Sequence, residues 1–366
     1  MALCKRYKKT FSEAMIVKDI SSENKVKKVV KKTVKNPLSQ FVTLGVILIL
    51  VSTLAQIGIL PSTITDALST TVIYAIIAIG FCLLMGYSGL ASLGTAGFAG
   101  IGVYCAFFVM GKAHQDLLMA IIVAIIVALI MGLIIGFISL RIEGMYLAIL
   151  TLGLAEILFE VFNNINNAPK IPYENNVFLG IFLDPNTKFI IFTVLYVILL
   201  CLTHNLINSP TGRAMLAMKN STSAAQAMGI SLLKYRLMAF VVSTIYAAIG
   251  GVLYMEVMYS GINLSGSNFL ALAMSLNILG AVIVGGSKSL WGTSVGVLLI
   301  FGIQTLFLNR IDFFVENPEY MGLFSGLLLV IVVMFYPGGL YQLFYELKFK
   351  IRKLLKKRKD KKYGVN

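Results

Sequence analysis

The feature that most constrains this chain is a series of apolar runs that begins at Leu38 and recurs almost to the end of the sequence. Each run has about 20 residues, the length that an α-helix needs to cross roughly 30 Å of hydrocarbon. Hydrophobic residues make up 58% of the 366 residues and charged residues only 13%, a balance that water-soluble domains do not show. The sequence therefore predicts an all-α, polytopic transmembrane helical bundle.

Proline, glycine and charged residues divide this apolar sequence into ten expected spans. The spans cover approximately residues 38–60, 64–86, 93–111, 117–140, 144–163, 188–207, 235–258, 268–286, 290–308 and 320–337. An even number of spans places both termini on one side of the membrane. We expect a membrane domain over residues 38–340, between an N-terminal tail at 1–37 and a C-terminal tail at 341–366.

The distribution of basic residues predicts that both tails are cytoplasmic. Of the 31 Lys and Arg residues, 21 lie before Pro37 or after Tyr341. With both termini inside, 27 basic residues are cytoplasmic and four are external, namely Lys112, Lys170, Lys188 and Arg310. The internal loops alone divide six to four, so the tails dominate this bias. Basic tails beside a membrane are placed to bind anionic lipid headgroups, and this location argues against nucleic acid as a partner.

The sequence lacks the motifs that would indicate an enzyme. At Gly280–Lys288, Gly286 stands where a phosphate-binding loop needs its lysine, and no Gly-x-Ser-x-Gly or metalloprotease motif is present. The four cysteines and two histidines are isolated and match no ligand spacing. They are Cys4, Cys82, Cys105, Cys201, His114 and His204. We therefore expect no catalytic residue, no metal site and no cofactor.

The most informative loop is the expected cytoplasmic segment 208–234. Pro210 and Gly212 are expected to end the preceding span, and the helix formers Ala214–Lys219 and Ala224–Met228 are separated by turn-prone residues. Gly229 is expected to cap the second of these short helices. The Ala-rich face of the loop suits docking against another protein, although a connecting helix without a partner has the same pattern.

This loop resembles the coupling segment of bacterial ATP-binding-cassette importer permeases. The matching residues are Gly212, Arg213, Ala214, Ala224, Ala225, Gly229 and Ile230. Further motifs between about Gly86 and Leu340 narrow the resemblance to the branched-chain amino acid permease family. They are Gly86–Gly89, Ser92–Gly94, Phe98, Gly100–Tyr104, Arg141–Tyr146, Thr151–Leu152, Ala155–Ile157, Gly285–Gly286, Leu290–Gly292 and Pro337–Leu340.

The resemblance implies the permease subunit of an importer for branched-chain or related apolar amino acids in the bacterial plasma membrane. Such a subunit would pair with a homologous permease, bind two cytoplasmic ATPases and accept substrate from an extracytoplasmic binding protein. The ATPases would hydrolyse ATP and push the 212–230 segment. The expected coupling residues are Gly212, Arg213, Ala214, Ala224, Ala225, Met228 and Gly229.

Two acidic residues within an expected span are candidates for the translocation path. Glu156 and Glu160 lie one helical turn apart, and an unpaired carboxylate facing lipid is costly, so both should face the bundle interior or water. A structural hydrogen bond to a neighbouring helix is the alternative. Gly97, Gly100 and Thr151 complete the set of expected path residues. The glycines between Gly86 and Gly102 favour close helix packing, and they also permit a broken helix.

The sequence leaves alternatives open for both the cargo and the class of transporter. Thr95, Val103 and Gly338 stand where similar sequences often have His, Ala and a basic residue. Because Thr95 falls in the glycine-rich region, urea, a nucleoside or a sugar stays open as the cargo. An ion-coupled secondary transporter would instead need a cluster of carboxylates within the membrane, and the sequence offers Glu156, Glu160 and Glu256.

Overall fold

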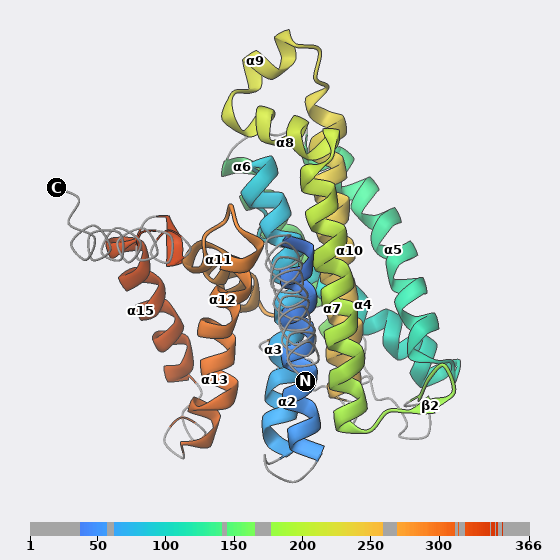
Figure 1. Cartoon of the computed structure of the whole chain (residues 1–366). Helices are drawn as coiled ribbons and strands as arrows, with labels where there is room; N and C mark the ends of the chain where they lie inside the picture. Colours follow the sequence, from blue (N-terminus) through green and yellow to red (C-terminus); the bar gives the residue numbers. More distant parts are fainter. Residues whose placement is uncertain are drawn as a thin grey trace, which may run out of the picture.

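A computed structural model describes residues 37–56, 62–140, 145–164, 177–258, 269–311, 314, 319–336, 338–340, 342 and 346. Long helices run side by side along one direction, and a short helical loop projects from one end of the bundle (Figure 1). The tails at 1–36 and 347–366 lie outside the described residues, so their expected cytoplasmic location and lipid contacts stay predictions.

Helices fill each of the ten apolar ranges expected from the sequence. In chain order they are α2 (Pro37–Gln56), α3 (Ser62–Phe81) with the π-helix η1 (Cys82–Ser88), α4 (Thr95–Ala106) with the π-helix η2 (Phe107–Lys112), α5 (Leu117–Ser139), α6 (Met145–Asn164), α7 (Pro185–Asn208), α10 (Leu232–Val257), α11 (Leu272–Gly285), α12 (Leu290–Val297) with the π-helix η5 (Leu298–Gly302) and α13 (Ile303–Leu306), and α15 (Glu319–Phe335). The loop between α7 and α10 contains α8 (Pro210–Asn220) and α9 (Thr222–Ala227), and a 3-10 turn η6 (Leu308–Arg310) follows α13.

Five described helices are long and apolar enough to cross a membrane. They are Ile64–Ser88, Thr95–Lys112, Leu117–Ser139, Pro185–Asn208 and Leu232–Val257. Four shorter apolar stretches cover Ser39–Leu54, Leu272–Gly285, Leu290–Leu306 and Tyr320–Val332. The prediction of an all-helical, multi-pass membrane protein is confirmed, whereas the count of ten spans stays a prediction.

The centre of the bundle is α3. Ile73, Ile76, Ile77 and Phe81 on this helix are completely buried, and α3 packs against α7, α10 and α12. In contrast, α5 exposes large apolar side chains such as Ile134 and Ile138 along one side and lies at an edge of the bundle (Figure 1). Apolar surface of this extent is stable against lipid and not against water.

The described strands form one small hairpin between α6 and α7. β1 (Val177–Phe178) pairs antiparallel with β2 (Ile181–Phe182), with Val177 opposite Phe182. Leu179 and Gly180 both have positive φ angles, of 51° and 80°, as a tight two-residue hairpin turn requires. The hairpin lies in the segment expected as a long external loop, and it leaves the bundle itself helical.

Two boundaries differ from the sequence prediction, both because proline begins a helix. α7 begins at Pro185, so Lys188, expected in an external loop, lies within the first turns of that helix and is buried. α8 begins at Pro210, so Pro210 and Gly212 lie inside a helix that was expected to start at Ala214. The ring of proline fixes φ near its helical value and costs no hydrogen bond in the first turn.

Candidate functional site

A break in the helix that follows α3 forms the first part of the site. η1 ends at Ser88, residues 89–94 are not helical, and α4 begins at Thr95. Gly89 has a φ of 76°, which ends η1 in the left-handed conformation that glycine tolerates best. This break connects the helices that fill the expected spans 64–86 and 93–111, and its residues Ser92 and Gly94 are buried inside the bundle.

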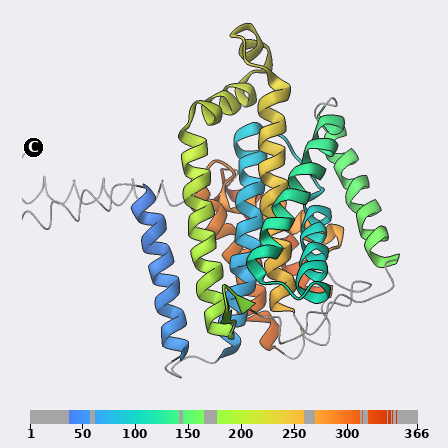
Figure 2. The ribbon, with the colours of Figure 1, turned by 90° about the vertical axis from the view of Figure 1, so that its right-hand side faces the viewer.

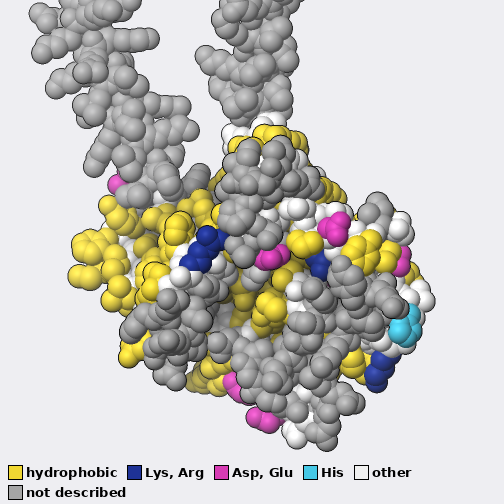
Figure 3. All heavy atoms as spheres, turned by 90° about the horizontal axis from the view of Figure 1, so that it is seen from below, with side chains coloured by type: hydrophobic (Ala, Val, Ile, Leu, Met, Phe, Trp, Pro, Cys, Tyr) yellow, Lys and Arg dark blue, Asp and Glu magenta, His cyan; other side chains and the backbone are white. Residues whose placement is uncertain are grey.

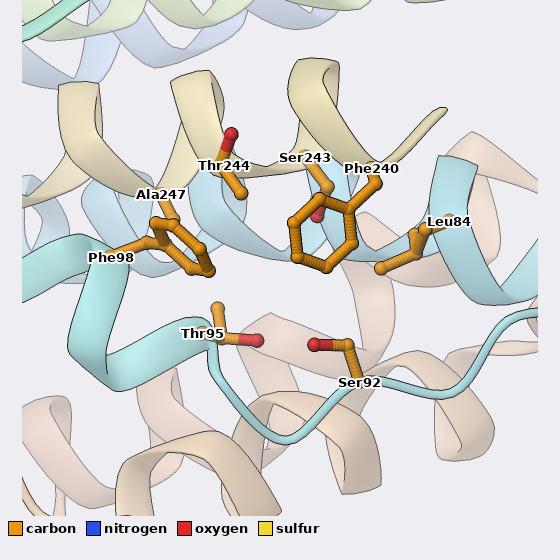
Figure 4. Close-up of a pocket in the computed structure, with 8 residues that line it drawn as sticks. All are labelled: Leu84, Ser92, Thr95, Phe98, Phe240, Ser243, Thr244 and Ala247. Carbon is orange, nitrogen blue, oxygen red and sulfur yellow. The ribbon is translucent and has the colours of Figure 1, made fainter. Parts of the chain in front are cut away.

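Side chains from η1, the break, α4 and α10 surround a small polar cavity. Its lining consists of Leu84, Ser92, Thr95, Phe98, Phe240, Ser243, Thr244 and Ala247. The hydroxyls of Ser92 and Thr95 point toward one another beneath the ring of Phe240, and Ser243 extends toward them from α10 (Figure 4). The hydroxyl of Thr244 instead donates to the carbonyls of Val241 and Ala128 and points away from the cavity (Figure 4). The three hydroxyls of Ser92, Thr95 and Ser243, gathered within an apolar bundle, can donate and accept hydrogen bonds to a small polar ligand.

Two phenylalanines keep this cavity closed. The rings of Phe98 and Phe240 meet edge to face, with their centroids 5.7 Å apart. The cavity volume is about 10 Å³, room for about one water molecule. Passage of a solute the size of an amino acid therefore requires α4 and α10 to separate.

A cluster of aromatic rings lies on the side of this cavity away from α8. Tyr74 stacks on Phe301 with centroids 3.9 Å apart, and Tyr254 stacks on Phe269 at 3.6 Å. Tyr74 precedes Leu84 by ten helical residues, which is about 15 Å along the helix axis. The rings join α3, α10 and η5 with the residues before α11.

The expected path residues Gly97, Gly100 and Thr151 lie behind the cavity, where α4 meets α6. A Cβ at Gly97 would lie 2.9 Å from Leu158 Cδ1, and Gly100 faces the ring of Phe162. Buried Thr151 accepts a hydrogen bond at 3.0 Å from the backbone N–H of Leu93, within the break. These three residues hold the break and α4 against α6, and none of them lines the cavity.

Glu156 and Glu160 lie on the exposed face of α6, beside Ile157, which is 64% exposed, and Val161. α6 stands at an edge of the bundle (Figure 2). The sequence led us to expect these carboxylates in the bundle interior or in water. In the described part of the chain they face outward, so the interior of this chain does not enclose them.

The cytoplasmic loop expected from the sequence folds as two short helices at one end of the bundle, with α8 packed against α7 and η1 and α9 farther out (Figure 1). Ser209 Oγ accepts a hydrogen bond from the N–H of Gly212 at the start of α8, and Ser221 Oγ accepts one from Ala224 at the start of α9. Gly229, with a φ of 78°, ends α9, and the N–H of Ile230 donates to the carbonyl of Ala225. These bonds form a Schellman motif, which confirms Gly229 as a helix cap.

The expected coupling residues divide between a buried and an exposed side of this loop. Gly212, Ala214 and Ala225 are buried, and a Cβ at Gly212 would overlap the carbonyl oxygen of Ile207. Arg213, Ala224, Met228 and Gly229 are exposed. Met228 is 84% exposed, so its side chain is accessible to a partner.

The described charged side chains are scattered at the opposite end of the molecule, with no single charged patch (Figure 3). One charged pair is buried. Nζ of Lys188 on α7 lies 3.2 Å from Oε1 of Glu256 on α10 and donates to the Glu256 backbone carbonyl at 3.1 Å. Glu256 is completely buried, and neither of its carboxylate oxygens accepts a hydrogen bond from the described residues. The pair joins α7 to α10 near the ends that lie away from α8.

Sequence reasoning missed the Lys188–Glu256 pair and the α10 side of the cavity. Thr95 was singled out from its position in the glycine-rich segment, but Ser243 and Thr244 were not. The available signal was two adjacent hydroxyl residues in an apolar span, followed by the small residues Ala247 and Ala248. Within the described residues, no group of three or more His, Cys, Asp or Glu side chains could hold a metal ion.

Comparison with known proteins adds family evidence to this geometry. The family described as the permease component of branched-chain amino acid transport systems matches residues 63–333. The high-affinity branched-chain amino acid transport system permease proteins LivM of Salmonella typhimurium and Escherichia coli are each 27% identical over 304 residues, covering 75% of this chain and 69% of theirs. The probable ABC transporter permease protein YphD of Escherichia coli is 28% identical over 194 residues, covering 50% of this chain and 55% of its own. No solved structure matches the chain.

Proposed function

The chain belongs to the permease-component family of branched-chain amino acid transport systems, and from this premise we propose that it is the membrane-spanning subunit of an importer for branched-chain amino acids. As an ABC permease it is a transport component and not an enzyme. The proposal adds that ATP is hydrolysed by two cytoplasmic ATPases that bind the α8–α9 loop, and that an extracytoplasmic binding protein supplies the substrate. We also propose that the chain crosses the membrane ten times, with both termini in the cytoplasm.

The observation that carries the coupling part of this proposal is the loop itself. α8 and α9 project beyond the bundle, and Arg213, Met228 and Gly229 are exposed on them (Figure 1). Arg and Met are both enriched at protein interfaces, and this loop exposes one of each. The loop is also capped at both ends of α9, so it reaches a partner already folded and loses little conformational entropy on binding.

The cavity and the aromatic cluster support a path for an amino acid with an apolar side chain. The hydroxyls of Ser92, Thr95 and Ser243 can bind the ammonium and carboxylate groups, while the rings of Phe98 and Phe240 contact an aliphatic side chain. The modest identity to the LivM proteins agrees with this cargo. A cargo such as urea would use the hydroxyls and leave the rings without an apolar group to contact.

The exposed carboxylates of α6 support a second permease subunit as a partner. Glu156 and Glu160 share a face with Ile157 within an apolar helix, and carboxylates in such a helix are costly against lipid. A neighbouring subunit would supply hydrogen-bond donors or enclose water between the two chains. The translocation path would then have α6 on one of its sides, which retains Glu156 and Glu160 as path residues of the assembled complex.

The coupling test uses substitutions on the loop. Met228→Glu and Arg213→Ala should prevent the ATPases from co-purifying and should abolish uptake in proteoliposomes, because a carboxylate replaces an apolar contact and a guanidinium is lost. Gln115→Glu is the control, since Gln115 is also exposed but lies at the other end of the bundle. Uptake by a wild-type complex that never contains an ATPase would refute the proposal in favour of an ion-coupled transporter.

The cargo test measures competition for radiolabelled leucine. Excess isoleucine and valine should suppress leucine uptake, whereas urea and a nucleoside should not. Thr95→Val keeps the shape of the side chain and removes one hydroxyl from the cavity, so it should raise the KM for leucine by about tenfold, the effect of one lost hydrogen bond of roughly 1–1.5 kcal/mol. Leucine uptake that isoleucine and valine leave unchanged would exclude the proposed cargo.

A further inference from the structure

Lys219, near the end of α8, reaches from the cytoplasmic loop into the bundle. Its Nζ donates hydrogen bonds to the backbone carbonyls of Met85 at 3.2 Å and Gly86 at 2.6 Å, both in η1. Its aliphatic stem lies against Gly89, where an added Cβ would be 3.1 Å from Lys219 Cγ. The last carbonyls of a helix lack intrahelical donors, so an ammonium at this end is bound by charge-assisted hydrogen bonds.

Lys219 makes these hydrogen bonds although its surroundings disfavour the charged form of its side chain. Burial of the side chain, followed by repulsion from Lys288, lowers the pKa of Lys219 below its ordinary value. α8 also buries Met215 and Met218 against the bundle. Those thioether side chains pack without directional preference, whereas hydrogen bonds to two fixed carbonyls weaken steeply when their geometry changes. Lys219 therefore fixes the position of α8 relative to η1 more strictly than the apolar contacts do.

The same end of η1 is held from its other side by the turn between α11 and α12. Sγ of Cys82 donates to the carbonyl of Ser287 at 3.3 Å, and the hydroxyl of Tyr87 donates to the carbonyl of Lys288 at 2.9 Å. A side chain at Gly86 would overlap the Ser287 carbonyl oxygen. The end of η1 thus lies between α8 and this turn and contacts both.

η1 leads directly to the polar cavity. Leu84 of η1 lines it, and Ser92 lines it from the break that follows Gly89. A displacement at Met85 and Gly86 reaches both residues through a few backbone bonds. Given the proposed function, on which this inference rests, we propose that Lys219 is a positioning residue that transmits the movement of α8 to η1 and thereby opens and closes the cavity.

The first test measures coupling in the assembled transporter. Lys219→Met keeps the stem and removes the ammonium, so uptake per ATP hydrolysed should fall about tenfold, the loss of one charge-assisted contact, while the ATPases still co-purify. Lys219→Arg should restore uptake per ATP hydrolysed to at least half of the wild-type value. Lys234→Met, the control at an exposed lysine of the same loop region, should leave uptake per ATP hydrolysed unchanged. An unchanged ratio in Lys219→Met, or a loss of folding or assembly that accounts for the defect, would overturn the inference.

The second test uses the permease alone, so it does not depend on the ATPases. Cys82 is completely buried at the contact with Ser287, and replacing the other cysteines by serine makes it a reporter of η1. Lys219→Met should speed maleimide labelling of Cys82 at least about fivefold, because η1 opens more often when one of its anchors is lost. Equal labelling rates in Lys219→Met and Lys234→Met would overturn the inference. If the wild-type chain binds no ATPase, the proposed function fails independently of this result.

Discussion

Removal of the ammonium of Lys188 should destabilise the fold strongly, because it would leave the carboxylate of Glu256 buried without a counter-ion. Nζ and Oε1 are 3.2 Å apart, and their attraction amounts to about 5 kcal/mol at an effective dielectric constant of about 20. Desolvation of both groups offsets much of this attraction, so the intact pair contributes little net stability. Lys188→Met removes the attraction and retains the desolvation of Glu256, at an expected cost of about 3–5 kcal/mol.

The partner substitution should cost less. Glu256→Gln removes the negative charge and keeps a side chain of the same size, while Lys188 still donates to the backbone carbonyl of residue 256. The double variant Lys188→Met/Glu256→Gln buries no charge at all. It should therefore recover most of the stability lost in Lys188→Met, since replacing a buried ion pair by neutral side chains is often close to neutral.

A double-mutant cycle measures this coupling. The free energy of unfolding of the four proteins would be determined in mixed micelles by titration with a denaturing detergent, followed by circular dichroism. The expected coupling energy between the two positions is about 2 kcal/mol or more, with the double variant more stable than Lys188→Met. Additive effects of the two single substitutions would show that the carboxylate of Glu256 finds another partner, and the reasoning about the pair would be wrong.

Two further predictions concern the loop and the outer face of α6. Gly212→Ala should lower the melting temperature more than Gly229→Ala, because a Cβ at Gly212 overlaps the Ile207 carbonyl. No atom lies within 4 Å of a Cβ at Gly229, so the cost there is that of a left-handed alanine, about 1 kcal/mol. Equal melting temperatures of the two variants would contradict the tight contact between α7 and α8. Cysteines introduced at Glu156 and Glu160 should form cross-links to the second permease subunit in the assembled complex, and labelling by lipid-soluble maleimide without any such cross-link would show that this face of α6 meets lipid.

The secondary structure of the cytoplasmic loop could be predicted well because local chemistry determines it. The turn between α8 and α9 falls at Ser221, within the turn-prone segment expected there. At the end of α9 the N–H of Gly229 donates to the carbonyl of Gln226, and the N–H of Ile230 donates to the carbonyl of Ala225. The predicted start of α8 was wrong because proline occurs both after the end of a helix and in the first turn of a helix. Here Pro210 begins a helix, because the hydroxyl of Ser209 accepts a hydrogen bond from the N–H of Gly212 and so caps the start of α8.

The polar cavity and the buried ion pair could not be predicted in the same way, because their members come together only through tertiary packing. Lys188 and Glu256 are 68 residues apart in sequence, and Ser92 meets Ser243 across the contact between the break and α10. Neither lysine nor serine has a local pattern that identifies its partner. Lys188 lies three residues after Pro185, which begins α7. It was expected in a loop because the helix was expected to start only at residue 188.

The glycine pairs show how one local motif acquires different roles from its surroundings. Gly292 and Gly296 have the four-residue spacing that lets helix backbones touch, and they contact α11, where a Cβ at Gly296 would overlap the carbonyl of Ala281. Gly322 and Gly326 on α15 have the same spacing, and an added Cβ would meet no described atom within 4 Å at either position. A face of α15 that is open, exposed and suited to close helix contact agrees with the proposed second permease subunit, which would bring a helix from outside this chain.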